Sequence, residues 1–207
     1  MPVLSLPIIS QNLSIMDPIN ILIGLNIIAT FAAHYSGAKK GFRTAVGESR
    51  EKPKSSLQTI PVLISTLSLI AMILGIFRIG TLEYLPSYES ARLIGLLIFI
   101  IFSWIQILSI RTLGENYSQD ILILKNHKLI TNGIYKAVRH PQYLSQILMD
   151  LGAAAALMSY IVLPLAVIEI PLLIMRANLE ERLLSKYFKD EFVEYKKKSG
   201  YLIPFIG

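Results

Sequence analysis

Long apolar runs separated by short polar segments are the main pattern along the chain. Three of these runs, residues 19–35, 59–77 and 91–110, approach the roughly 20 residues that a helix needs to cross a lipid bilayer. A fourth run, residues 144–175, is too long for one crossing and too short for two, which would need about 40 residues. It therefore predicts a short or tilted helical hairpin, with its turn near residues 159–164.

The polar segments complete the prediction of an all-α, polytopic membrane protein. Residues 179–198 are charged and amphipathic, which predicts a surface helix after the hairpin. Residues 120–138 are too polar to cross lipid, so we expect them to fold over the helix ends. Residues 2–14 are apolar, but a proline breaks them and the basic start of a secretory signal is missing, so we expect an interfacial lead-in. The pattern predicts about five membrane-embedded helices, the last two being the hairpin.

Composition indicates a membrane protein of one domain. Of the 207 residues, 53% are hydrophobic, and the mean hydropathy is +0.55, which favours membrane spans over a soluble core. The chain has no cysteine, and this excludes disulfides and thiolate metal sites. Its three histidines, His34, His127 and His140, are scattered along the sequence, so we expect no metal.

The net charge of +6 is concentrated in residues 39–54 and after Lys125. By the positive-inside rule, the basic segment 36–56 is cytoplasmic, the N-terminus and the weakly charged loop 78–92 lie outside, and the C-terminus lies inside. Because the basic runs are short and flank apolar spans, they favour contact with anionic membrane lipids over nucleic acid.

Residues 127–143, HKLITNGIYKAVRHPQY, hold most of the side chains that can do chemistry. Thr131, Asn132 and Gly133 form a turn signal, and Pro141 stands where the first residue of a helix is expected. The free backbone N–H groups of that helix favour an anionic ligand nearby. Basic and aromatic residues that anchor a helix at the membrane surface would give the same pattern.

This stretch and a second one, residues 176–195 (RANLEERLLSKYFKDEFVEY), resemble the isoprenylcysteine carboxyl methyltransferase family and the related phospholipid methyltransferases. Residues 113–118 also resemble the L-G-x-x-[aromatic]-S connection of that family, with Tyr117 where tryptophan is more usual. The sequence similarity covers residues 113–205, and the N-terminal half resembles the family only in its hydropathy pattern.

The resemblance implies one integral-membrane methyltransferase domain, residues 1–207, with a cofactor pocket on the cytoplasmic face. Residues 1–112 would supply membrane spans, and residues 113–207 would form the cofactor-binding and catalytic region. The implied membrane is the plasma membrane in a prokaryote and the endoplasmic reticulum in a eukaryote.

The implied reaction is methyl transfer from S-adenosylmethionine to the C-terminal carboxylate of a prenylated cysteine, or to a similar lipidic carboxylate that enters from the bilayer. By resemblance, Arg176 would hold the substrate carboxylate and Glu180 would bind the cofactor's ammonium or another of its polar groups. The other implied cofactor contacts are His127, Lys128, Leu129, Ile130, Tyr135, His140, Pro141, Gln142 and Tyr143. Without the family, Arg176 and Glu180 also fit an ordinary ion pair between residues four apart on a helix.

Methyl transfer to a carboxylate needs neither a metal nor a strong base, because a carboxylate is already ionised at neutral pH. Such a site has to align the reacting atoms and exclude water. The sequence also allows other functions. The acceptor could be a phospholipid amine or another isoprenoid, and the protein could instead be an NADPH-dependent membrane reductase of similar architecture, or a small transporter or scaffold. Arg176 favours an anionic acceptor, since it would repel a protonated amine.

Three charged residues are left without a predicted role. Asp150 and Glu169 lie within the hairpin, each about 10 Å from its cytoplasmic end, so they could be neighbours. They could lock the hairpin as a hydrogen-bonded pair or contact the substrate. Arg139 could bind a lipid phosphate or cap nearby carbonyl groups.

Overall fold

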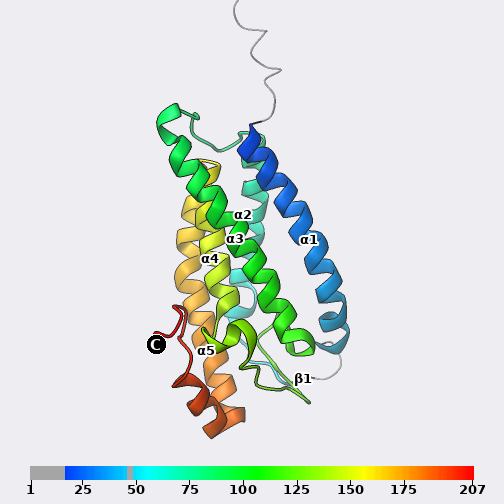
Figure 1. Ribbon diagram of the computed structural model, residues 1–207. Coiled ribbons are helices and arrows are strands. Elements are labelled where there is room, and N and C mark those ends of the chain that lie inside the picture. Colours follow the sequence, from blue (N-terminus) through cyan, green and yellow to red (C-terminus); the bar gives the residue numbers. More distant parts are fainter. Residues whose placement is uncertain (1–16, 46–48) are drawn as a thin grey trace, which may run out of the picture.

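The computed structural model describes residues 17–45 and 49–207, without the side chains of residues 34–45. Its long helices run side by side in a bundle (Figure 1). They are α1 (Pro18–Ala45), α2 (Ile60–Ile76), α3 (Glu89–Leu113), α4 (Pro141–Ala156) and α5 (Val162–Lys196). The lead-in expected over residues 2–14 lies outside the described residues.

Short elements connect these helices and gather mainly at one end of the bundle. Strand β1 (Ser49–Glu51) pairs antiparallel with β2 (Ile123–Leu124). The 3-10 helices are η1 (Ser56–Gln58), η2 (Pro86–Tyr88), η3 (Gly114–Asn116) and η4 (Gly133–Lys136). The segment predicted to fold over the helix ends therefore does so as β2, η4 and the loops around them.

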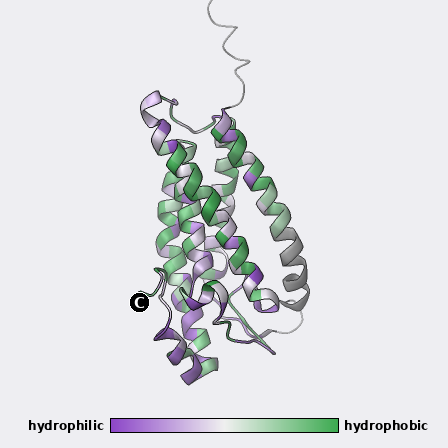
Figure 2. Cartoon of the chain, viewed as in Figure 1, coloured by the Kyte–Doolittle hydropathy of each residue, from purple (hydrophilic) through white to green (hydrophobic). Residues whose placement is uncertain are grey.

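The helices have the composition of membrane spans. Three segments of the described chain are long and apolar enough to cross a bilayer, namely Ser56–Ile76, Pro86–Asn116 and Val162–Lys196. The apolar part of α1, Pro18–Ala33, and the 16-residue α4 are shorter. Figure 2 shows hydrophobic residues along the bundle and hydrophilic ones at the end that carries β1, β2 and the last turns of α5. The protein is thus a helical, multi-pass membrane protein, while the count of five membrane-embedded helices stays a prediction.

Two predicted boundaries are wrong. The loop expected from residue 36 begins later, because α1 continues through residues 36–45. This stretch contains two glycines but no proline, and its two alanines and three basic residues favour helix. The surface helix expected at residues 179–198 is not separate, because α5 continues from the hairpin to Lys196. Its backbone leaves helical geometry only at Lys189, where φ is 43° and ψ is −118°.

Other local predictions are confirmed. Helix α2 matches the run 59–77 closely, and Pro141 is the first residue of α4. The hairpin turns between Ala156 and Val162, close to the expected position. Gly133 has a φ of 57°, in the left-handed region that favours glycine.

The tightest packing in the bundle joins α3 to α4 through two glycines. A Cβ atom added to Gly95 would lie 2.6 Å from the backbone nitrogen of Ala156, and one added to Gly152 would lie 2.7 Å from that of Phe99. Small residues allow such close backbone approach between membrane helices. This contact fixes the position of α4, whose first turns carry several of the predicted site residues.

A charged cluster holds the helices at the opposite end of the bundle. Arg92 of α3 is buried and makes an ion pair with Asp17, with Nη2 and Oδ1 2.7 Å apart. Its Nε also donates to the carbonyl of Ala156 at 3.0 Å, and its guanidinium lies over the ring of Tyr84. The cluster ties α1, α3 and α4 together and leaves the buried cation fully paired.

Candidate active site

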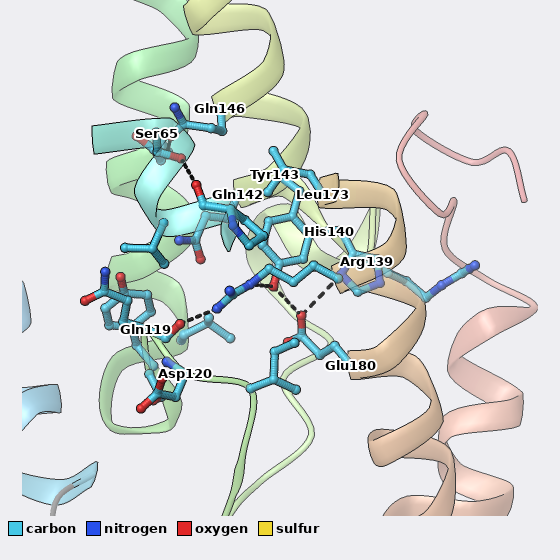
Figure 3. A pocket seen from close by; sticks show the side chains of 18 of the residues that line it. Ser65, Gln119, Asp120, Arg139, His140, Gln142, Tyr143, Gln146, Leu173 and Glu180 are labelled. Atoms are coloured by element: carbon cyan, nitrogen blue, oxygen red, sulfur yellow. Dashed lines mark hydrogen bonds and ion pairs between the residues drawn. The ribbon is translucent and has the colours of Figure 1, made fainter. Parts of the chain in front are cut away.

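All predicted site residues except Pro141 line one cavity of about 400 Å³. The cavity lies at the end of the bundle where the polar connections fold, and Figure 3 shows side chains from α4, α5 and the loop before β2 converging there. It also extends between the apolar helices, where its lining includes Ile27, Leu69, Met72 and Phe99. The cavity therefore has a polar end and, between the helices, a mainly apolar arm, called the apolar arm below, in which some polar side chains such as Ser103 and Gln106 also take part.

Pro141 has a different place. It is fully buried and opens α4, so its ring does not reach the cavity lining. Proline suits this position because the first helical residue needs no N–H partner and its φ angle is already helical. Pro141 therefore starts helix α4, whose first turn and N-cap place Tyr143 and His140 in the cavity wall.

Arg176 and Glu180 are joined through a third residue, Tyr143. The Nε of Arg176 donates to the hydroxyl of Tyr143 at 3.2 Å, and that hydroxyl donates to Oε2 of Glu180 at 2.9 Å. The two residues thus present a cation and a carboxylate to the same cavity from successive turns of α5. This arrangement differs from the direct ion pair that their spacing alone also allowed.

The guanidinium of Arg176 also holds the N-terminal half of the chain against α5. Its Nη1 donates to the carbonyl of Leu57 at 2.7 Å and to that of Gln58 at 3.4 Å, and its Nη2 donates to the carbonyl of Gln119. Gln58 in turn exchanges hydrogen bonds with the backbone of Ile121, at 2.9 Å in each direction. Buried Arg176 therefore organises the wall of the cavity as well as facing it.

His140 is held between the two glutamates of α5. Its Nδ1 lies 3.7 Å from Glu180 and its Nε2 lies 3.4 Å from Glu181. The ring stacks on Tyr143 with centroids 5.5 Å apart, and the ring of Tyr201 meets it edge-on. These contacts fix the imidazole as a rigid part of the cavity wall.

Arg139 caps carbonyl groups, which is one of the two roles that the sequence left open. It forms an ion pair with Glu181 at 2.7 Å and donates to the carbonyls of Lys196, Ser199 and Gly207. The C-terminal segment is thereby fastened beside the site.

Residues 127–130 line the cavity as a loop between β2 and η4. Burial lowers the pKa of His127 and outweighs the opposite effect of the negative charge on Glu180, so its imidazole is neutral at pH 7. Its Nδ1 is buried and has no hydrogen-bond partner within the described part of the chain. A buried polar atom of this kind, facing a cavity, is suited to bind a ligand.

Tyr135 contributes a neutral aromatic wall. Burial raises its pKa well above the usual value, and its carbonyl accepts a hydrogen bond from the Tyr195 hydroxyl at 2.7 Å. The phenol therefore stays protonated at physiological pH and offers a ring face and a hydroxyl, not a charge.

Sequence reasoning missed several residues of the cavity wall. Glu181 does not line the cavity, but it holds Arg139 and His140, which do, and its position next to Glu180 was the available signal. Asn116 was not predicted, yet its side chain accepts from the backbone N–H of Lys128 at 2.8 Å. The lining also includes Ser65, Ser103, Gln106, Gln146 and Asp150 from the helices. Among residues 17–45 and 49–207, no group of three or more His, Asp or Glu side chains is placed to hold a metal.

Comparisons with known proteins agree with this architecture. A solved structure described as the eukaryotic intramembrane Ras methyltransferase ICMT superposes with a TM-score of 0.60. The alignment covers 93% of this chain and 70% of that one, at 22% identity, and shows a shared fold.

Curated relatives match in sequence as well. The protein-S-isoprenylcysteine O-methyltransferase of Saccharomyces cerevisiae is 29% identical over 131 residues, which are 60% of this chain and 53% of that protein. A probable protein-S-isoprenylcysteine O-methyltransferase of Oryza sativa subsp. indica is 31% identical over 129 residues, 59% of this chain and 65% of that protein. The match thus spans between half and two thirds of these relatives.

A family model places the similarity on the site itself. The model of the isoprenylcysteine carboxyl methyltransferase (ICMT) family matches residues 93–186, a region that runs from α3 through the 127–143 stretch to Arg176 and Glu180. The resemblance indicated by the two sequence motifs is therefore confirmed: residues 93–186 are similar to the isoprenylcysteine carboxyl methyltransferase family.

Proposed function

We propose that this protein transfers a methyl group from S-adenosylmethionine to the carboxylate of a prenylated cysteine or a similar lipidic carboxylate. The observation that carries the proposal is the Arg176–Tyr143–Glu180 chain of hydrogen bonds, which presents a cation and a carboxylate to one cavity. That cavity is polar at one end and apolar along its arm, as a lipid with a charged head requires. The names of the curated relatives support the same reaction.

The polar end fits the cofactor. A cavity of about 400 Å³ lies within the range of small-molecule sites, about 300 to 1,000 Å³. Glu180 offers a carboxylate for the ammonium group, and the free Nδ1 of neutral His127 offers a hydrogen-bond partner for the nucleoside. Tyr135 and Tyr143 supply aromatic faces, which attract a sulfonium cation. S-adenosylmethionine supplies an activated methyl group on positively charged sulfur.

The apolar arm fits the isoprenoid chain, and Arg176 lines the same cavity. Four hydrogen-bond acceptors surround its guanidinium, and with five N–H groups the side chain keeps one for a ligand. Its positive charge would orient the ionised acceptor carboxylate without a proton transfer. His140, wedged between Glu180 and Glu181, would keep the glutamate in place and help to exclude water.

The basic segment after α1 and the C-terminal end of α5 lie at the same end of the bundle as the cavity (Figure 1). By the positive-inside rule we place this end, and with it the active site, on the cytoplasmic face. The substrate would then enter from the bilayer through the apolar arm, and anionic lipids would surround the basic segments. The membrane would be the plasma membrane of a prokaryote or the endoplasmic reticulum of a eukaryote.

Detergent-solubilised protein is expected to bind S-adenosylhomocysteine saturably and to bind NADPH weakly or not at all. The reason is that Glu180 faces the cavity and would repel the added phosphate of NADPH. Isothermal titration with each compound measures this directly, and methyl transfer to N-acetyl-farnesylcysteine beside phosphatidylethanolamine identifies the acceptor. Saturable binding of NADPH in the absence of S-adenosylhomocysteine binding would instead indicate a reductase.

His140→Ala is expected to weaken S-adenosylhomocysteine binding by about tenfold, the effect of losing roughly 1.4 kcal/mol of interaction. The substitution removes the ring that stacks on Tyr143 and spaces Glu180 from Glu181. Titration of the variant beside Lys136→Ala, an exposed residue of η4 outside the cavity, measures the effect. Unchanged affinity in a folded His140→Ala protein would remove His140 from the cofactor site.

A further inference from the structure

The C-terminal loop, residues 200–207, runs back along α5 from the end of that helix (Figure 1). The hydroxyl of Tyr201 lies 3.0 Å from the carbonyl oxygen of Ile174 and 2.8 Å from Oδ1 of Asn178, within hydrogen-bonding distance of both. Ile174 belongs to the apolar run 144–175, and the next residue, Met175, is exposed. The loop therefore lies at the depth where the apolar part of α5 ends.

Three large apolar side chains of this loop are open to the surroundings. Ile203, Phe205 and Ile206 are 58%, 72% and 63% exposed. The backbone that carries them is nevertheless held in place, because the N–H of Tyr201 donates to the carbonyl of Ile206 at 2.8 Å and Ile203 pairs with Ile206 in an antiparallel bridge. Exposed apolar groups on an ordered loop are typical of a contact surface, and tyrosine is enriched where a membrane meets water.

A cluster of lysines comes directly before the loop. Residues 196–198 are all lysine, all three are exposed, and residues 196–207 contain no aspartate or glutamate. Basic side chains next to apolar ones match the surface of a bilayer, where anionic headgroups lie beside acyl chains. The charge and the depth of the segment together favour lipid over a protein partner as the surface that covers the loop.

The loop is bonded directly to the start of α4. The N–H of His140 donates to the carbonyl of Tyr201 at 3.2 Å, and the N–H of Phe205 donates to the carbonyl of Ala137 at 3.0 Å. The ring of Tyr201 also meets the imidazole of His140 edge-on, with centroids 5.3 Å apart. An interaction that holds the loop in place therefore also holds His140, which lines the cavity.

We infer that the C-terminal loop is a membrane anchor for the cavity: Ile203, Phe205 and Ile206 enter the acyl region, and residues 196–198 contact anionic headgroups. Insertion removes three apolar side chains from water, and the lysines are attracted by the negative potential of the membrane surface. Because the loop is bonded to α4, its docking keeps His140 in position. The insertion is independent of the proposed reaction, whereas its effect on the site rests on the proposed role of His140 in binding the cofactor.

The first test measures the depth of the loop in a bilayer. The chain has no cysteine, so full-length Phe205→Cys protein in lipid nanodiscs carries one spin label. Its collision rates are measured with oxygen, which concentrates among acyl chains, and with a water-soluble nickel complex. They are expected to lie closer to those of Leu97→Cys, on the exposed apolar side of α3, than to those of Asp190→Cys, exposed near the kink of α5.

Two results of this measurement would overturn the anchor. One is a label at position 205 that meets the nickel complex as readily as the label at position 190. The other is a label shielded from both reagents, which would indicate that a protein partner covers the loop. The measurement needs neither cofactor nor acceptor, so failure of the proposed function would not change what it shows about the loop.

The second test measures the effect of the headgroups on the cofactor site. Addition of phosphatidylglycerol to phosphatidylcholine nanodiscs is expected to strengthen S-adenosylhomocysteine binding by about fivefold, the effect of one lysine near an anionic surface. The double variant Lys197→Gln, Lys198→Gln is expected to lose this dependence and to keep the wild-type affinity in phosphatidylcholine. The control is Lys125→Gln, Lys189→Gln, which removes the same charge from exposed positions outside residues 196–207 and is expected to retain the dependence.

Each other outcome contradicts a stated part of the inference. A wild-type affinity that does not change with lipid charge would overturn the support of His140, even if the spin label shows insertion. A dependence that survives in Lys197→Gln, Lys198→Gln would overturn the contact of these lysines with headgroups. Equal loss in both double variants would show a general effect of net charge and would overturn that contact as well.

Discussion

Arg176→Ala is expected to lower methyl transfer to N-acetyl-farnesylcysteine by about a hundredfold to a thousandfold, the usual effect of removing one preorganised charged donor from an active site. The acceptor carboxylate would lose the cation that orients it. S-adenosylhomocysteine affinity is expected to change much less, because the cofactor's ammonium is assigned to Glu180. Some loss of stability is also expected, since the carbonyls of Leu57, Gln58 and Gln119 lose their donor.

Three further variants separate these effects. Glu180→Gln is expected to raise the S-adenosylhomocysteine dissociation constant by about tenfold to hundredfold, as a charge-assisted hydrogen bond is lost. Arg176→Lys keeps the charge but lacks the planar fork of donors, so it is expected to recover only part of the turnover. Arg182→Ala, an exposed arginine on the same helix, is the control and is expected to behave as wild type.

The measurements are titration calorimetry, kcat and KM for methyl transfer, and the midpoint of thermal unfolding for each variant. Should Arg176→Ala and Glu180→Gln weaken cofactor binding equally and lower the midpoint equally, both residues would be structural. The assignment of Arg176 to the substrate would then fail.

Gly152→Ala is expected to lower the free energy of unfolding by about 1 to 3 kcal/mol, the typical effect of overpacking a tight contact. The new methyl group would lie 2.7 Å from the backbone nitrogen of Phe99 and 2.8 Å from the carbonyl of Gly95. Neither atom can rotate away as a flexible side chain would. Helix α4 would have to move, and with it His140, Tyr143 and Asp150, so weaker S-adenosylhomocysteine binding is expected together with the loss of stability.

Gly24→Ala is the matched control for this substitution. It is also a helical glycine in the bundle, but the nearest atom to its added Cβ would be the Cδ1 of Ile76 at 3.5 Å, an ordinary contact. Alanine is favoured over glycine within a helix by up to about 1 kcal/mol, so Gly24→Ala is expected to be neutral or stabilising. Thermal unfolding in detergent compares the two, and an equal effect of both substitutions would contradict the close-contact explanation.

The apolar runs were enough to predict most helices, because a membrane span has to satisfy its backbone within a continuous apolar stretch. The start of α4 was predicted from Pro141 and the turn before it from Gly133, since each reports on its own backbone geometry. The boundaries that were wrong lie at the ends of α1 and within α5. There, charged residues were interpreted as a loop or as a new helix. Lysine, arginine and alanine favour helix, however, and no proline ends these stretches, so the helix continues even past Gly37 and Gly41.

The two motifs also indicated which residues share a site, since all but Pro141 line one cavity. The chain by itself did not determine how those residues contact each other. Arg176 reaches the carbonyl of Leu57, 119 residues away in sequence, and the Tyr143 hydroxyl lies between Arg176 and Glu180. Asp150 and Glu169 were expected as possible neighbours. Only the tertiary structure shows that Asp150 lines the cavity and that Glu169, which is also fully buried, does not.

The physical reason for this division is the range of the interactions. Hydropathy, helix starts and turns depend on a residue and its near neighbours, so they are present in the sequence. Hydrogen-bond partners such as Arg139 with Glu181, or Gln58 with Ile121, depend on how distant segments of the chain pack, and close contacts such as Gly95 against Gly152 contribute to that packing. Only the folded bundle brings those atoms within bonding distance.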